Sequence, residues 1–203
     1  MTSDTLTREP NSLVSLDDRV LDAAAASAVG RGFDAVTIDD IASGAGVSRA
    51  TVYRLFPGGR DVLFEALRVR ETSRLLDDVH AEVAHIDDLA DLVVGAVVAA
   101  SGALRNDEAL ADLLAAEPGA TLGRLTVDGL PRAIAMASRV FAPLLAPHLD
   151  AHAALSLVDV LARLTLSHFL APSDIVDMTD ADSVRDHLTP FIAAATANTT
   201  GAS

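Results

Sequence analysis

Residues 37–56, TIDDIASGAGVSRATVYRLF, decide the fold of this chain. Their apolar residues recur at helical spacing in two short groups, which are Ile38, Ile41, Ala42 and Ala45, then Val47, Val52 and Leu55. Gly46 separates the two groups, and glycine takes the positive φ of a tight turn without a steric penalty. Two short helices joined by such a turn form a helix-turn-helix, which presents its second helix to the major groove of DNA. The stretch therefore predicts a sequence-specific DNA-binding regulator, with an ordinary helical hairpin in an all-α core as the alternative.

The polar residues of this stretch suit the ends and the outer surface of the two helices. Thr37 is placed to cap the first helix, with Asp40 in its first turn, and Ser48 is placed to cap the second. Arginine donates two hydrogen bonds to guanine, and hydroxyl groups bond to phosphate oxygens. Arg49 is therefore expected in the major groove, with a further phosphate contact as the alternative. The full set of predicted DNA-contacting residues is Thr37, Ser48, Arg49, Ala50, Thr51, Tyr53, Arg54 and Arg60.

Residues 16–70 resemble the DNA-binding region of the TetR (tetracycline-repressor) family of bacterial regulators. The resemblance is carried by Gly32-Phe33, Thr37 through Ala42, Ala45 through Ser48, Thr51 through Tyr53, and Phe56-Pro57. It implies one helix before the helix-turn-helix, at 16–31, and a long fourth helix after it, at 60–80. The turn Pro57-Gly58-Gly59-Arg60 is one residue longer than the Pro-Ser-Lys or Pro-Ser-Arg turn that the family usually has.

The composition favours a purely helical fold. Half of the 203 residues are hydrophobic, only 3% are aromatic, and none is cysteine, which excludes disulfides and cysteine-based zinc sites. We predict an all-α protein of about nine helices, with an N-terminal three-helix helix-turn-helix DNA-binding domain and a C-terminal helical bundle. The predicted parts are a disordered tail at 1–15, the DNA-binding domain at 16–60, a ligand-binding and dimerisation domain at 61–197, and a disordered tail at 198–203.

Charge is spread unevenly over a chain whose formal net charge is −14. Residues 1–70 carry eight arginines and ten acidic residues, whereas the remainder carries seven arginines and nineteen acidic residues. The sequence has no lysine, so contacts to DNA phosphates must come from arginine, hydroxyl groups or backbone amides at helix N-termini. The acidic second half would orient the nearly neutral first half toward DNA.

The second half contains further helical segments, which are expected at 87–104, 107–116, 131–145, 151–170 and 180–196. Pro118 is expected to end the second of them, residues 120–129 are ambiguous, and Pro190 should kink or break the last. No uncharged apolar run is long enough to span a membrane, and the polar, acidic N-terminus does not look like a secretory signal. We therefore expect a cytoplasmic protein without membrane association.

Two functions remain open for the second domain. The family resemblance implies a sensor, in which a small, mostly apolar ligand binds inside the bundle and releases the protein, most often a repressor, from a palindromic double-stranded DNA operator. The alternative is a ligand-independent dimerisation or protein-interaction module. A ligand pocket is assigned to Ala96, Met136, Phe141 and His168, and core filling is the alternative for each of them.

The resemblance also implies a homodimer through the last two main helices. The predicted interface residues are Leu155, Val158, Leu161, Leu188 and Phe191. His148 and His152 have a spacing that suits a metal ion, but a solvated or capping role is the alternative, and no metal site is predicted. We find no catalytic group with a partner at a recognisable spacing and no glycine-rich phosphate loop, so we expect neither an enzyme nor a cofactor.

Overall fold

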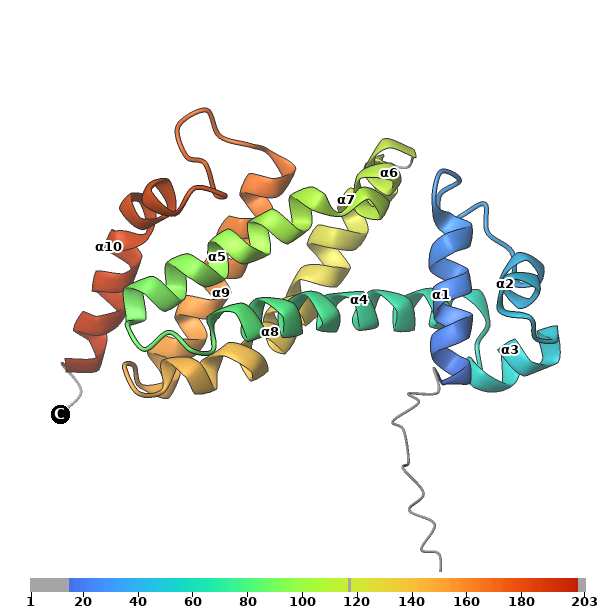
Figure 1. The fold of residues 1–203 in the computed structure, drawn as a ribbon, viewed down its shortest axis with the longest axis horizontal. Helices are drawn as coiled ribbons and strands as arrows, with labels where there is room; N and C mark the ends of the chain where they lie inside the picture. The colour runs from blue at the N-terminus through green and yellow to red at the C-terminus, as the bar shows by residue number, and fades with distance from the viewer. Residues whose placement is uncertain (1–14, 117, 201–203) are drawn as a thin grey trace, which may run out of the picture. The chain divides into compact units, whose positions relative to one another are not determined.

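The computed structural model describes residues 15–116 and 118–200. These residues form ten α-helices and one π-helical segment and contain no β-strand, so the predicted all-α fold is confirmed. The elements in chain order are α1 (Leu16–Ala28), α2 (Ile38–Ala45), α3 (Arg49–Leu55), α4 (Arg60–Val83), α5 (Leu89–Asn106), α6 (Glu108–Ala116), α7 (Pro118–Gly123), the π-helical η1 (Arg124–Gly129), α8 (Leu130–Leu145), α9 (Ala151–Leu170) and α10 (Ala181–Thr200) (Figure 1). The described residues divide into two compact units, 15–28 with 33–67 and 29–32 with 68–200.

The first unit is built around one apolar core to which four helices contribute. Val20 of α1, Ile41 of α2 and Val52 of α3 are fully buried in it. Full burial of an aliphatic side chain stabilises a fold by about 1.5–3 kcal/mol, so each of these residues fixes its helix in the unit. Leu63 and Leu67 of α4 complete the same core, which is why the compact unit reaches Leu67 rather than ending at residue 60.

The turn between α2 and α3 has the geometry that the sequence predicts. Gly46 follows the last residue of α2 with φ of 65° and ψ of 37°, which is the left-handed conformation. The amide of Val47 donates to the carbonyl oxygen of Ala42 over 2.9 Å, and Arg19 Nη2 donates to the carbonyl oxygen of Ala45 over 2.7 Å. The end of α2 is therefore satisfied both by its own turn and by a side chain from α1.

The second unit packs α5, α8, α9 and α10 around a separate apolar core, and α5, α9 and α10 contact one another (Figure 1). α5 contributes Val93 and Val97, α9 contributes Leu157, and α10 contributes Val184 and Leu188. Residues from helices more than eighty positions apart in the sequence thus share one core, as expected for a helical bundle.

α5 and α9 are long and apolar enough, by length and composition alone, to cross a membrane. Both supply buried residues to the core of the second unit, and the core helix of a soluble protein passes the same test. α9 also carries a largely exposed ion pair, in which Arg163 Nε donates to Asp159 Oδ2 over 2.8 Å. Charges facing lipid are costly, so we interpret both helices as core helices of the bundle.

α6 ends at Ala116, as predicted, and the second unit departs from the prediction in the segments that follow it and in α10. Pro118 begins α7, because proline lacks an amide hydrogen and suits the first helical position; residue 117 lies outside the described part of the chain. Residues 120–129, ambiguous in the sequence, complete α7 and form η1, and α7 raises the helix count to ten. α10 runs without a break through Pro190 to Thr200. Of the kink or break expected at Pro190, the break is wrong and the kink stays a prediction. The predicted tail residues 198–200 are helical. Residues 1–14 and 201–203 lie outside the described residues.

Two glycine substitutions should shift stability in opposite directions. Gly46→Ala forces a side chain into positive φ and should lower the free energy of unfolding by about 1 kcal/mol. Gly102 lies inside α5, where an added Cβ meets nothing within 4 Å. Gly102→Ala should therefore raise the free energy of unfolding by about 0.5–1 kcal/mol. Urea unfolding followed by circular dichroism measures both, and a Gly46→Ala protein as stable as wild type would contradict the requirement for glycine.

Candidate DNA-binding surface

The predicted caps of the two short helices are both present. Thr37 and Asp40 form a capping box at α2, in which Asp40 N donates to Thr37 Oγ1 over 3.2 Å and Thr37 N donates to Asp40 Oδ2 over 3.0 Å. Ser48 caps α3 by accepting from the amide of Thr51 over 3.1 Å. Since each cap typically contributes about 1 kcal/mol, these residues fix where the two helices begin.

The caps also decide which hydroxyl groups remain available to DNA. Thr37 Oγ1 donates its proton to Asp40 Oδ2 over 2.8 Å, so it cannot donate to a phosphate while this bond persists. Ser48 Oγ and Thr51 Oγ1 lie 2.9 Å apart and share one hydrogen bond. That bond uses only one of their two hydroxyl protons, so one O–H of this pair can still donate to a phosphate oxygen.

α3 has one buried and one exposed side. Val52 is fully buried, while Thr51 and Leu55 are half-buried. The exposed residues are Arg49, Ala50, Tyr53 and Arg54, all four of which the sequence analysis assigned to DNA contacts. The guanidinium of Arg54 has no hydrogen bond or ion pair to another residue in the described part of the chain. The geometry brings these four side chains together on one short helix that is held at its buried side and at both ends.

Arg49 is exposed but is paired with an acidic residue of α2. Its Nη1 donates to Asp39 Oδ2 over 3.1 Å, and its Nε lies 3.1 Å from Asp39 Oδ1. Both side chains remain about 60% exposed, at 61% for Arg49 and 63% for Asp39. The sequence alone predicts no role for Asp39, because the two residues are ten positions apart and only the fold brings them together.

The longer turn before α4 supports the ring of Tyr53. Gly58 and Gly59 both have positive φ, of 115° and 74°. An added Cβ on Gly59 would lie 3.2 Å from Tyr53 Cε1, and one on Gly58 would lie 2.6 Å from Val62 Cγ2. Gly59 therefore lets the turn approach the tyrosine ring, which stays 46% exposed, and Gly58 lets it pass close to Val62.

Arg60 is engaged within the first unit. Its Nη1 donates to the carbonyl oxygen of Asp34 over 2.8 Å, and its Nη2 donates to Asp34 Oδ1 over 3.2 Å. A weaker bond of 3.5 Å joins Nη1 to the carbonyl oxygen of Val36. Arg60 thus ties the start of α4 to the loop before α2, and its contact with a DNA phosphate stays a prediction.

The residues assigned to a ligand pocket all lie in the second unit. Ala96 and Phe141 are half-buried and pack against the core cluster, and Met136 is also half-buried. The His168 ring nitrogen Nδ1 lies 2.9 Å from the carbonyl oxygen of Leu164, and its ring meets that of His187 edge-on at 5.6 Å. These positions agree with core filling, and a role in ligand binding stays a prediction.

The residues assigned to a dimer interface separate into two groups. Leu155 and Phe191 are exposed, at 49% and 37%, and Leu161 is partly buried. Val158 and Leu188 are 5% and 0% exposed, so their side chains fill the core of the second unit rather than its surface.

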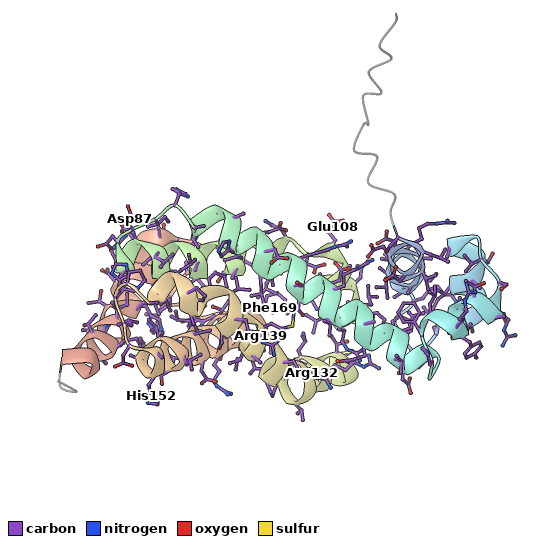
Figure 2. All side chains as sticks on the ribbon, turned by 90° about the horizontal axis from the view of Figure 1, so that it is seen from below. Asp87, Glu108, Arg132, Arg139, His152 and Phe169 are labelled. Carbon is purple, nitrogen blue, oxygen red and sulfur yellow. The ribbon has the colours of Figure 1, made fainter. Side chains whose placement is uncertain are left out.

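The histidine pair at the start of α9 gathers no further metal-ligating side chain. His148 is half-buried, whereas His152 lies at the surface of the second unit (Figure 2). Over residues 15–116 and 118–200, no group of three or more histidine, cysteine or acidic side chains could hold a metal ion.

Comparison with known proteins places these features in context. Residues 20–67 match the model described as bacterial regulatory proteins, tetR family. An uncharacterized HTH-type transcriptional regulator of Mycobacterium tuberculosis is 33% identical over 129 residues, which cover 60% of this chain and 66% of the relative. The HTH-type transcriptional regulator AlkX of the same organism is 41% identical over 68 residues, which cover 34% of this chain and 32% of the relative. The match thus spans slightly less than two thirds of the first relative's length.

Solved structures share the fold of the whole described chain. The TetR family repressor AlkX from a Dietzia species, implicated in biodegradation of n-alkanes, has a TM-score of 0.67 and 22% identity, covering 89% of this chain and 96% of that one. The multidrug binding protein EbrR has a TM-score of 0.62 and 23% identity, covering 87% of this chain and 94% of that one. At these identities the likeness concerns the fold.

A helix-turn-helix unit followed by an all-α bundle defines a class of bacterial regulatory proteins, and this chain has both parts in that order. The segment matched by the family model, 20–67, coincides closely with the first compact unit. Over residues 20–67 the protein belongs to the TetR family.

Arg60→Ala should destabilise the first unit. Removing the guanidinium leaves the Asp34 carbonyl and carboxylate without this donor and should lower the free energy of unfolding by about 1–2 kcal/mol, since the site is partly exposed. Arg54→Ala is the matched control, because Arg54 makes no such bond, and it should change stability by less than about 0.5 kcal/mol. Urea unfolding compares the two, and equal stabilities would show that Arg60 has no structural role.

Proposed function

We propose that this protein is a transcriptional regulator, acting as a repressor, that binds a palindromic double-stranded DNA operator as a homodimer. The observation that carries the proposal is the exposed face of α3, where Arg49, Ala50, Tyr53 and Arg54 project from a helix whose other side is buried. In helix-turn-helix proteins, residues near the N-terminus of the second helix contact base edges.

In the proposed complex, each side chain of α3 has a distinct task. Arg49 is the first residue of the helix and reads a base edge, for which guanine is the preferred partner of arginine. Tyr53 and Arg54 lie further along the exposed face and contact phosphates, together with the spare O–H of the Ser48–Thr51 pair. These phosphate contacts fix the position of the protein on DNA without reading its sequence.

A homodimer would supply the second reading head that a palindrome requires. Leu155 of α9 and Phe191 of α10 are large apolar side chains exposed on the two helices that the family resemblance implicates in dimerisation. Their burial against a second copy of the chain is favourable by about 25 cal/mol per Å² of apolar surface. A two-fold dimer places two α3 helices on half-sites about 34 Å apart, or a multiple of that distance.

We further propose that the second unit binds a small apolar ligand that weakens DNA binding. Fold neighbours include a protein implicated in n-alkane biodegradation and a multidrug binding protein. Ser101 Oγ, on α5, is buried without a hydrogen-bond partner among the described residues, so a ligand group that bonds to it would relieve a desolvated hydroxyl. A thermal-shift screen with n-alkanes, fatty acids and cationic drugs separates this proposal from a ligand-independent dimerisation module, since a ligand of the native state raises the melting temperature.

Binding to an operator requires no catalysis, and bacterial DNA lies in the cytoplasm. A repressor acts by occupying its operator, and a ligand acts only through different affinities for the DNA-bound and free states. We therefore propose a cytoplasmic, non-enzymatic protein.

Arg49→Ala and Tyr53→Phe should weaken DNA binding in different ways. Arg49→Ala should cost about 1–3 kcal/mol on the selected operator and relax the base preference at one position of each half-site. Tyr53→Phe should weaken binding to every sequence alike, by about 1 kcal/mol, because it removes one hydroxyl bond to the backbone. The measurement is affinity for DNA selected from a random library and for random duplex of equal length. An equal loss on both duplexes for Arg49→Ala would contradict base reading.

Leu155→Glu should dissociate the dimer. A buried carboxylate at an apolar interface is unpaired and costly, so the variant should sediment as a monomer at micromolar concentration where wild type is a dimer. Val127→Glu, at a residue of η1 that is 72% exposed, introduces the same charge away from the proposed interface and should leave the dimer intact. A monomeric wild-type protein, or a Leu155→Glu variant that remains dimeric, would refute this interface.

A further inference from the structure

Asp39 occupies an unexpected place for an acidic residue, since it lies on the surface that the proposed function turns toward DNA. Its neighbour Asp40 has a structural task in the capping box of α2. Asp39 takes no part in that box and instead reaches across to the first residue of α3, where it pairs with Arg49. The ion pair therefore joins the first turns of the two helices of the helix-turn-helix.

We propose that Asp39 is a specificity-determining residue, which acts through Arg49 by keeping its guanidinium away from phosphates and oriented for a base edge. The inference rests on the proposed function, because it assigns a role within DNA reading. Asp39 is a positioning residue in this scheme, and Arg49 remains the residue that contacts the base.

The geometry leaves Arg49 enough donors for both partners. Arginine has five N–H donors, and the contacts of Nη1 and Nε with the two carboxylate oxygens of Asp39 engage at most two of them. Reading the O6 and N7 atoms of guanine requires two. Asp39 can thus hold one edge of the planar guanidinium while another edge faces the DNA, which reduces the number of orientations that Arg49 samples.

The same carboxylate disfavours binding that does not read sequence. Non-specific affinity comes from neutralising phosphates, and the salt dependence of binding steepens by about 0.9 for each phosphate neutralised. With Asp39 beside it, Arg49 presents little net charge to a phosphate, and the carboxylate itself is repelled. Both effects lower affinity for random DNA, whereas a guanine edge is uncharged and still accepts the arginine donors.

The Asp39–Arg49 ion pair contributes little to the stability of the fold. Both side chains are more than half exposed, and exposed ion pairs typically contribute about 0–1 kcal/mol. Removing the Asp39 charge should therefore leave the fold intact, and any effect on DNA binding can be separated from unfolding by a melting curve.

The test measures the ratio of affinities for selected operator and random duplex in Asp39→Asn at several salt concentrations. We expect affinity for random DNA to rise about threefold, its salt dependence to steepen by about 0.9, and the ratio to fall about fivefold or more. Asp61→Asn is the matched control. Asp61 is an exposed residue in the first turn of α4, within the same compact unit, so the charge change is identical and the ratio should stay at its wild-type value.

An Arg49→Ala background shows whether Asp39 acts through Arg49. There, Asp39→Asn should change both affinities by one common factor, because no guanidinium remains to be oriented. If Asp39→Asn in the otherwise wild-type protein changes both affinities equally, Asp39 only repels DNA and the inference is overturned. If it lowers the ratio equally without Arg49, Asp39 reads DNA itself, which also overturns it. A wild-type protein that selects no sequence refutes the proposed function and this inference with it, whereas the other two outcomes leave the proposed function standing.

Discussion

The chain must turn sharply between α2 and α3 within residues 46–48, and the position of every exposed side chain on α3 depends on that turn. Gly46 makes the turn possible by adopting a left-handed conformation. Arg19 of α1 then holds the end of α2 through the carbonyl oxygen of Ala45, and the burial of Val52 fixes α3 from its inner side. Because the inner side is fixed by packing, the outer side can carry polar residues that add nothing to the core.

In a chain without lysine, the partner of each arginine in the first unit decides what that arginine can do. Arg19 and Arg60 donate to backbone carbonyl oxygens and so help to build the unit. Arg49 is partly engaged by Asp39, and the guanidinium of Arg54 makes no hydrogen bond or ion pair with another described residue. These differences could not be predicted from residue type, which is why the set of predicted DNA-contacting residues contains both a structural arginine, Arg60, and one without a partner for its side chain, Arg54.

Local features of the fold were predictable from the sequence, whereas features that depend on distant contacts were not. Thr37, Gly46 and Ser48 act on residues within four positions, so their roles as caps and turn follow from spacing alone. The link between Asp34 and Arg60 spans twenty-six positions, and only the packed unit brings the two together.

In the second unit, too, the sequence does not show which side of an apolar helix is buried. Leu155 and Val158 lie three positions apart on α9, and the sequence assigned both to one surface. Leu155 is exposed and Val158 is buried, because the bundle core covers one side of the helix and leaves the other open. A helix that is apolar nearly all round does not reveal which of its sides the core will cover.

The acidity of this protein and the Asp39–Arg49 pair act in the same direction at two length scales. Most of the negative excess lies beyond residue 70, where it reduces attraction to any DNA at long range. In the proposed scheme Asp39, which lies about 3 Å from the guanidinium of Arg49, weakens the attraction of that arginine to phosphates and leaves its contact with an uncharged base edge in place. Binding in such a protein cannot rest on phosphate attraction alone, so base edges must supply a larger share of it. A lower affinity for random DNA, with the base contacts retained, is then the condition under which few contacts on a seven-residue helix can discriminate one site from the rest.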